Sequence, residues 1–370
     1  MEQTYTLTLT EDCNLACVYC YEHNRTGRAM RLDTAKAVLN DAFATMQYDD
    51  LLTIDFFGGE PFLEFDLIKE IVAFTREAAA SGRLISKYRF FATSNGTLIH
   101  GDIQKWLREN PSFRVGLSLD GTKQMQDINR CHSFDRIDLP FFHELYPNQP
   151  VKMTISDQTL AHLAEGVIFC HENGFQVSCN LAYGIDWEDD TFIRLLEKQL
   201  DKLIDYYIQN PAVPPCSLLS RKLAAVGAKE EGRKTIQRWC GAGTAMHTFD
   251  CDGTQYPCQF FMPVSCGKQQ PVRQGELHFY ENIPIDVLDE KCQSCAANEV
   301  CPTCYGSNYV EYGNIYHKND AQCKLEKKII YENACFFVKR WDAGMLAHLP
   351  ENELRASLLG AKLILEQFAS

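Results

Sequence analysis

The sequence predicts an α/β protein with parallel strands, followed by a second region that is rich in cysteine. Strand-like and helix-like segments alternate six times between residues 5 and 210, which indicates parallel strands joined by right-handed crossovers. A proline-rich segment at 211–215 interrupts this pattern, and cysteines become frequent from residue 240 onward. The alternation alone is compatible with an open doubly wound sheet or with part of a barrel.

Each predicted element has a local reason. Apolar and polar residues alternate in the first strand at 5–10, whereas the segment at 52–57 is short, apolar and rich in strand formers. The first helix, at 31–48, can be capped by Asp33 and repeats apolar residues at steps of three and four. The other predicted strands are 87–94, 114–119, 151–155 and 175–181, and the other predicted helices are 64–81, 103–109, 159–173 and 188–210.

The second region has its own local signals. Asp252 and Gly253 indicate a two-residue turn between strands at 246–250 and 254–257, and this hairpin would bring Cys240 and Cys258 together. Two helices at 324–341 and 351–368 end the sequence.

Composition and charge limit the function classes. The 370 residues carry 36 basic and 49 acidic side chains, a net charge of −13, so we expect no nucleic-acid partner. No signal-peptide pattern and no apolar run near ~18 residues is present, so we expect a cytoplasmic protein that does not contact membranes. In that compartment 17 cysteines predict metal or cluster ligands rather than a disulfide framework.

Three cysteines follow the first strand in a CxxxCxxC spacing: Cys13, Cys17 and Cys20, with Tyr19 before the third. Three thiolates in so short a loop can hold three corners of an iron–sulfur cluster and leave the fourth iron open to a small molecule. Half of a zinc site or buried thiols are the alternatives that the spacing leaves open. The loop resembles that of the radical S-adenosylmethionine (radical SAM) enzymes. The resemblance implies a [4Fe-4S] cluster that binds S-adenosylmethionine and cleaves it to methionine and a 5′-deoxyadenosyl radical.

Further motifs resemble the same family. Gly58, Gly59 and Glu60 begin a GGEP segment at the end of the second strand, where glycines allow close backbone approach and Glu60 can accept a bond from an ammonium group. The segments with Asn95 and Ser118 resemble the TNG and SLDG segments of the family, the second of which supplies a serine near the cofactor. The predicted cofactor-binding residues are Tyr19, Gly58, Gly59, Glu60, Asn95, Ser118 and Arg130, the last of which would meet the cofactor carboxylate or lie exposed.

A second group of cysteines begins with Cys240 and Cys258 in a Cx12Gx4C spacing. This pattern resembles the first half of the SPASM extension of radical enzymes that act on peptides and proteins, and the resemblance implies two auxiliary [4Fe-4S] clusters. By position, the first cluster would use Cys240, Cys258 and Cys304, and the second would use Cys292, Cys295, Cys301 and Cys323. Zinc sites are the alternative that spacing leaves open.

The sequence departs from the family pattern in this region. Two residues precede Cys304 where the family usually has three, and no fourth ligand for the first auxiliary cluster follows the motif. Cys251, Cys266 or a substrate thiolate could complete it. Sulfatase-maturing relatives carry an aspartate base at the position of Gln259, and glutamine cannot accept a proton at neutral pH.

The resemblance implies a partial (β/α)6 TIM-type barrel followed by a small SPASM domain with a β-hairpin and C-terminal helices. We expect a barrel at 1–185, a helical linker at 186–235, the SPASM domain at 236–345 and a C-terminal helix at 346–370. About ten residues precede the cysteine loop, so we expect no N-terminal peptide-recognition domain.

The function expected from these features is oxidative modification of a ribosomal peptide, by a thioether or carbon–carbon crosslink. The expected partners are a peptide or protein substrate and an external electron donor such as flavodoxin or ferredoxin. A sulfatase-type (formylglycine) maturase is the alternative within the class, and Gln259 disfavours it. A zinc-stabilised binding protein without catalysis is the alternative outside it.

Overall fold

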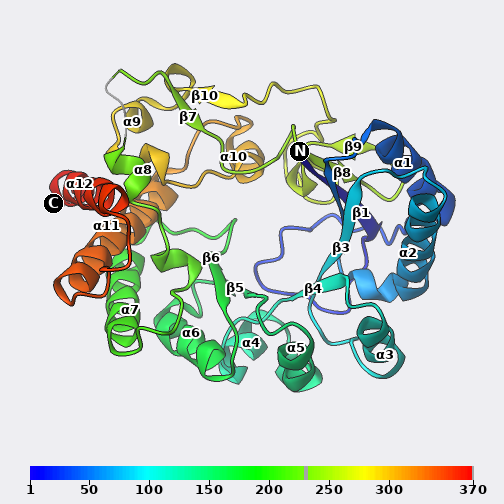
Figure 1. Ribbon diagram of the computed structural model, residues 1–370, viewed down its shortest axis with the longest axis horizontal. Helices are drawn as coiled ribbons and strands as arrows, with labels where there is room; N and C mark the ends of the chain where they lie inside the picture. Colours follow the sequence, from blue (N-terminus) through cyan, green and yellow to red (C-terminus); the bar gives the residue numbers. More distant parts are fainter. Residues whose placement is uncertain (229–231, 369–370) are drawn as a thin grey trace.

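The computed structural model describes residues 1–228 and 232–368. Six parallel strands, arranged in chain order, form its first half (Figure 1). The strands are β1 (Glu2–Thr10), β2 (Leu51–Gly58), β3 (Lys87–Ser94), β4 (Phe113–Leu117), β5 (Val151–Ile155) and β6 (Val177–Leu181). Each pairs in parallel with its neighbour, and a parallel bridge between Ser118 and Lys152 connects β4 to β5. The result is a curved sheet with helical crossovers, which confirms the predicted fold class and matches a partial barrel.

Helices cover the outer face of this sheet (Figure 1). They are α1 (Leu32–Thr45), α2 (Phe65–Ala80), α3 (Gly101–Glu109), α4 (Lys123–Asn129), α5 (Leu139–Leu145), α6 (Leu163–Glu172) and α7 (Asp190–Gln209). The apolar positions that predicted α1 are the ones it buries, including Val38, Leu39 and Phe43. The short helices α4 and α5 were not predicted, because neither has a long apolar period.

The predicted hairpin is confirmed, and it extends the barrel sheet. Strand β8 (Met246–Phe249) pairs antiparallel with β9 (Gln255–Tyr256), and β8 also pairs in parallel with β1, with Thr4 opposite Met246. The order of this sheet is therefore β4-β3-β2-β1-β8-β9. The cysteine-rich region is thus attached to the open edge of the barrel by main-chain hydrogen bonds.

The remaining elements are short, apart from two long helices. Strands β7 (Thr235–Gln237) and β10 (Asn282–Pro284) form a separate antiparallel pair. The helices are α8 (Ala224–Gly227), α9 (Glu290–Gln293), α10 (Tyr305–Tyr312), α11 (Asp320–Asp342) and α12 (Glu351–Phe368). Single 3-10 turns are η1 (Pro61–Glu64), η2 (Phe134–Arg136), η3 (Leu160–His162), η4 (Ser217–Leu219), η5 (Gln259–Phe261), η6 (Ile285–Val287) and η7 (Ala296–Glu299).

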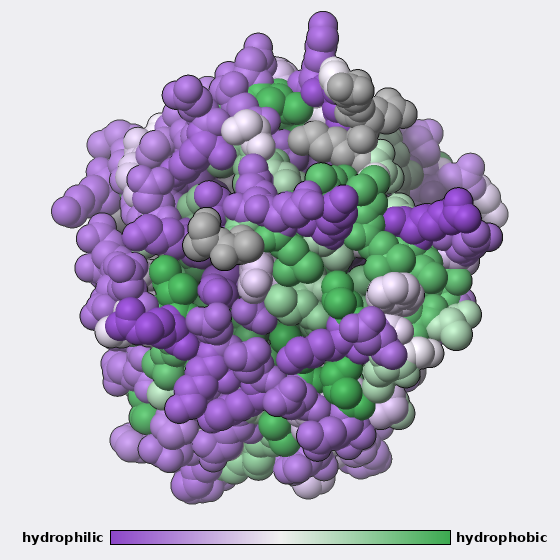
Figure 2. All heavy atoms as spheres, turned by 90° about the vertical axis from the view of Figure 1, so that its left-hand side faces the viewer, coloured by the Kyte–Doolittle hydropathy of each residue, from purple (hydrophilic) through white to green (hydrophobic). Residues whose placement is uncertain are grey.

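Three groups of buried apolar side chains stabilise these parts. The largest fills the barrel and its helices, a second lies in the cysteine-rich region around Phe261 and Tyr305, and a third joins α8, α11 and α12. Figure 2 shows apolar surface gathered on the face that the C-terminal helices form, and α12 leaves Leu359 and Leu363 exposed. Among the described residues, no helix is both long enough and apolar enough to cross a membrane.

Candidate active site

The loop with Cys13, Cys17 and Cys20 leaves the carboxyl end of β1 and packs against the GGEP turn. Gly59 N donates to Thr10 O at 3.0 Å, and Glu60 N donates to Asp12 O at 2.9 Å. Gly58 has a φ of 136°, and a Cβ built on it would lie 2.1 Å from Thr10 O. A Cβ on Gly59 would lie 2.3 Å from Asp12 O. Both positions therefore require glycine because the two backbones are in direct contact.

A cavity of about 570 Å³ opens beside this loop, at the carboxyl ends of the barrel strands. Its walls bring together every residue predicted for the catalytic cluster and its cofactor: Cys13, Cys17, Cys20, Tyr19, Gly58, Gly59, Glu60, Asn95, Ser118 and Arg130. Residues separated by more than 100 positions thus meet in one place because successive parallel strands end at one rim.

Glu60 is buried under this cavity and held by the chain. Its carboxylate accepts from Asn95 N at 2.8 Å, Ser94 Oγ at 2.9 Å and Phe62 N at 3.2 Å. Burial raises the pKa of Glu60 to about 7, although these hydrogen bonds act in the opposite direction. The side chain therefore joins the GGEP turn to the end of β3, and acceptance from a cofactor ammonium group stays a prediction.

Arg130 is buried and paired rather than exposed. Its Nε donates to Asp120 Oδ2 at 2.9 Å, and its guanidinium lies 5.3 Å from the centre of the Tyr19 ring. Tyr19 donates to the same carboxylate at 2.6 Å. Asp120 lies in the SLDG segment, but the sequence interpretation gave it no role; the structure identifies it as the residue that joins Tyr19 and Arg130 to the strand ends.

Two further charged residues of the cavity were also missed. Arg25 Nη2 lies 3.0 Å from Cys20 Sγ, and the Glu22 carboxylate lies 3.7 Å from Arg25. Glu22 Oε1 and Arg25 Nε are buried and have no hydrogen-bond partner among the described residues. The sequence offered one signal for them, their position directly after the cysteine loop.

The donor set of this loop fits an iron–sulfur cluster. Burial raises the pKa of Cys13, and it raises the pKa of Cys17 to about 11; the neighbouring thiols of the loop act on both in the same direction. A thiolate in this position therefore needs a nearby cation, which cluster iron supplies. Within residues 1–228 and 232–368, no three His, Cys, Asp or Glu side chains are grouped so that they could hold a single metal ion.

The later cysteines fall into two separate sets. Cys258 and Cys304 interact electrostatically with each other and with Cys240, and the Tyr183 hydroxyl donates a hydrogen bond to the Cys304 thiol. Neither candidate for a fourth ligand joins this set, because the thiol of Cys251 contacts Thr8 O and that of Cys266 contacts Pro263 O.

The second set consists of Cys292, Cys295, Cys301 and Cys323, whose thiols interact electrostatically. Lys318 Nζ lies 2.7 Å from Cys301 Sγ. Burial by itself lowers the pKa of this lysine, but Cys301 and Glu326 raise it above its ordinary value. Both sets have the membership that the resemblance implied for the auxiliary clusters. Their role as ligands stays a prediction.

The cysteine-rich region also forms one wall of the active-site cavity. Gln259 and Phe260 line it together with Tyr183, and the ring of Phe260 stacks on Tyr21 at 4.3 Å between centres. The Gln259 side chain hydrogen-bonds the Tyr21 hydroxyl. The position at which sulfatase-maturing relatives carry a base is therefore at the cavity and holds a carboxamide.

Comparison with known proteins agrees with this geometry. The family model for the radical SAM superfamily matches residues 7–198 of this chain. The cysteine-type anaerobic sulfatase-maturating enzyme of Clostridium novyi is 33% identical over 336 residues, which cover 79% of this chain and 84% of that enzyme.

Two solved structures are similar in fold. That of anSMEcpe with bound AdoMet and the Cp18Cys peptide has a TM-score of 0.69 and 19% identity, over 93% of this chain and all of that one. That of SuiB from Streptococcus suis bound to precursor peptide SuiA has a TM-score of 0.58 and 18% identity, over 86% and 75%.

Proposed function

This chain belongs to the radical SAM superfamily, and on that premise we propose that it oxidatively modifies a ribosomal peptide by forming a thioether or carbon–carbon crosslink. Membership makes the chain an enzyme that uses a [4Fe-4S] cluster and S-adenosylmethionine. It also removes the alternative of a zinc-stabilised binding protein without catalysis.

The cavity supports this proposal through what its residues can hold. When bound, the cluster and S-adenosylmethionine supply a 5′-deoxyadenosyl radical that abstracts hydrogen. Cys13, Cys17 and Cys20 would hold the cluster, and the backbone at Gly58 and Gly59 would bind the cofactor. The strand-end polar groups Asn95 and Ser118 would orient it. The buried Asp120–Arg130 pair would keep Tyr19 and the cysteine loop in place.

One observation carries the choice of a peptide substrate. The cavity beside the cysteine loop continues to Gln259, Phe260 and Tyr183, so the cofactor residues and the cysteine-rich region face one space. Two solved structures with this fold contain a bound peptide, anSMEcpe with Cp18Cys and SuiB with SuiA. A peptide inserted from the open side of the barrel would place one residue at the cofactor.

The two later cysteine sets would complete an oxidation. Crosslinking removes one hydrogen atom, one proton and one further electron from the substrate; the proton passes to solvent and the electron needs an acceptor. Auxiliary [4Fe-4S] clusters on Cys240, Cys258 and Cys304 and on Cys292, Cys295, Cys301 and Cys323 would provide it. An external donor such as flavodoxin or ferredoxin would return the electron needed for each cleavage.

A sulfatase-type maturase is the second candidate. The sequence identity with the Clostridium novyi enzyme across most of both chains supports it, and the carboxamide at Gln259 disfavours it. The test is to co-express the enzyme with the short reading frames that neighbour its gene and to weigh the peptides. Loss of two hydrogens per crosslink supports the proposed function, whereas a cysteine that loses sulfur and two hydrogens and gains one oxygen supports the maturase.

A further inference from the structure

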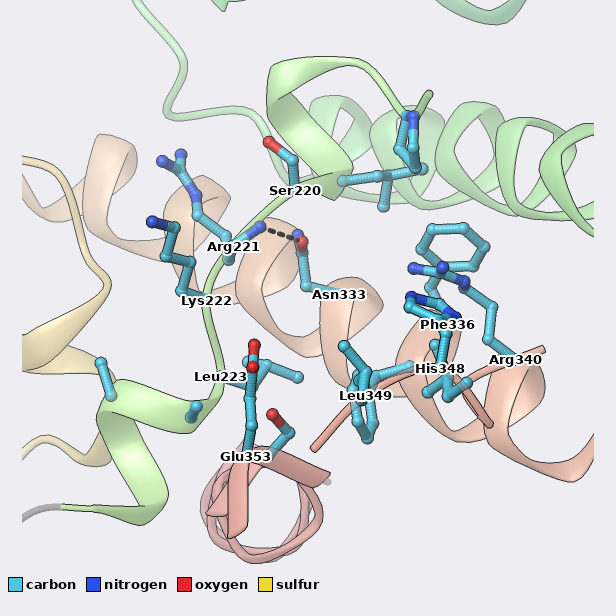
Figure 3. A pocket seen from close by; sticks show the side chains of 17 residues that line it. Ser220, Arg221, Lys222, Leu223, Asn333, Phe336, Arg340, His348, Leu349 and Glu353 are labelled. Atoms are coloured by element: carbon cyan, nitrogen blue, oxygen red, sulfur yellow. Dashed lines mark hydrogen bonds between the residues drawn. The ribbon is translucent and has the colours of Figure 1, made fainter. Parts of the chain in front are cut away.

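A second large pocket lies away from the active-site cavity, between the segment 215–225 and the helices α11 and α12. We call it the helix pocket. Its volume is about 470 Å³, and Figure 3 shows Arg221 and Lys222 on one side, Arg340 and His348 on the other, and Leu223 and Leu349 between them. The pocket therefore combines an apolar floor with cationic side chains at both ends.

Close packing fixes the shape of this pocket. A Cβ on Gly227 would lie 1.9 Å from Ala356 O, and one on Gly360 would lie 2.1 Å from Leu223 O. These contacts bring α8 and α12 together at backbone distance. On the other side, Asn333 of α11 accepts from Arg221 N at 2.9 Å, the bond drawn in Figure 3. The walls are thus held by the fold and do not depend on a ligand.

The cations of the helix pocket are incompletely paired. Arg221 lies 3.4 Å from Glu326, yet its buried Nε has no hydrogen-bond partner among the described residues. In the part of the chain that the structure describes, Lys222 and Arg340 form no ion pair. Burial lowers the pKa of Arg340, and no carboxylate offsets this effect. Among the described residues of the lining, Glu353 is the acidic one, beside Arg221, Lys222 and Arg340. These described side chains are therefore net positive in a chain whose net charge is −13.

The helix pocket is connected to the active-site cavity by shared walls. A smaller cavity of about 80 Å³ shares Arg221 with the helix pocket. The same small cavity shares Asn180, Leu181 and Tyr183 with the active-site cavity. The three cavities therefore lie next to one another between the cysteine loop and the C-terminal helices, and each shares at least one lining residue with the next.

From these observations we infer that the helix pocket binds a segment of the peptide substrate at a distance from the residue that reacts. The segment carries an apolar side chain, which fills the floor at Leu223 and Leu349, next to an acidic side chain, which pairs with Arg340. Lys222 accommodates a second carboxylate at the other end. This inference rests on the proposed peptide substrate and adds the chemistry by which that substrate is recognised.

The test uses fluorescein-labelled synthetic peptides that contain Glu-Leu-Phe-Glu, or Gln-Leu-Phe-Gln as the matched uncharged form. Binding to the anaerobic holoenzyme is measured by fluorescence anisotropy. The Glu peptide is expected to bind about tenfold more tightly than the Gln peptide. Arg340→Glu is expected to remove that preference, and Arg340→Lys to keep most of it.

Lys362→Glu is the control, because Lys362 is an exposed cation of α12 outside the pocket and should leave binding unchanged. Equal binding of the two peptides, or unchanged binding to Arg340→Glu, would overturn the inference. The bound labelled peptide is also displaced with unlabelled Glu peptide or with N-acetylglutamate. If N-acetylglutamate displaces it at the same concentration as the unlabelled peptide, the site is one for small carboxylates and the inference is overturned.

Failure of this inference and failure of the proposed function give different results. If a co-expressed peptide is crosslinked and Arg340→Glu leaves its KM unchanged, the helix pocket is not its binding site although the function stands. If no peptide is modified but the Glu peptide binds through Arg340, the proposed function fails while the pocket keeps its ligand class. The inference expects a raised KM, an unchanged kcat and unchanged 5′-deoxyadenosine formation without peptide.

Discussion

Arg130 and Asp120 form a buried ion pair beside the cysteine loop, with Arg130 Nε 2.9 Å from Asp120 Oδ2 and Nη2 3.2 Å from Oδ1. Asp120 also accepts from Thr154 N at 2.9 Å, at the end of β5. The nearby Arg130 Nη1 lies 4.0 Å from Cys17 Sγ. The pair therefore connects the cysteine loop to two neighbouring barrel strands.

Asp120→Asn is expected to destabilise the enzyme strongly. It leaves the Arg130 charge buried without a counter-charge, which costs about 3–5 kcal/mol of unfolding free energy. Asp135→Asn removes an exposed partner of Lys123 and is expected to cost less than about 1 kcal/mol. Denaturant unfolding of both variants measures the difference. Equal losses of unfolding free energy would show that the buried pair stabilises the fold no more than the exposed pair does.

Gly58→Ala is expected to prevent cluster assembly. The added Cβ would collide with Thr10 O and would displace the GGEP turn from the cysteine loop. Gly82→Ala is the matched control, since Gly82 also has a positive φ but has open space around its Cβ position, so only about 1 kcal/mol of backbone strain is expected. Iron content after anaerobic reconstitution distinguishes them. Full iron loading of Gly58→Ala would contradict the assigned role of this contact.

Glu332 of α11 is expected to make stability depend on pH. Burial and the nearby Asp201 raise its pKa to about 7, so between pH ~4.5 and ~7 the unfolded chain has lost a proton that the folded chain retains. Stability from this group is therefore lost as pH rises through that window. Glu332→Gln should make the enzyme more stable than wild type above pH 7, by roughly 1–3 kcal/mol. Urea unfolding at pH 5 and pH 8 tests this, with the exposed Glu351→Gln as a control that should change neither value.

Tyr183→Phe is expected to lower the reduction potential of the proposed first auxiliary cluster. The Tyr183 hydroxyl donates a hydrogen bond to the Cys304 thiol, and such bonds stabilise the reduced state of a cluster. Its loss should shift the potential by roughly 50 mV, close to a tenfold change in a one-electron equilibrium. A redox titration followed by electron paramagnetic resonance measures this shift. Tyr48→Phe, at an exposed position, should leave the potential unchanged.

Local patterns in the sequence were sufficient to predict most of the barrel. The ranges of β3 and β5 agree with the prediction to the residue, because each strand contains aromatic or β-branched residues and ends directly before a polar or glycine-containing segment. The helices α4 and α5 were missed because they are too short for a helical period to emerge.

Long-range contacts were less accessible. The pairing of β8 with β1 joins residues about 240 positions apart, and no local signal specifies it. Motif spacing placed the cysteines, whereas the partnership of Asp120 with Arg130 and the charges of Glu22 and Arg25 at the cavity depend on tertiary packing. The helix pocket likewise is lined by segments that are far apart in the sequence and meet only in the folded chain.

The central claim is tested most directly by one mass measurement. A peptide that is encoded next to the enzyme's gene is co-expressed with the enzyme under anaerobic conditions and then weighed. The account predicts the loss of two hydrogens per crosslink with the wild-type enzyme and an unmodified peptide with Cys17→Ala. An unchanged peptide mass with the wild-type enzyme, or a cysteine that has lost sulfur and two hydrogens and gained one oxygen, would contradict it.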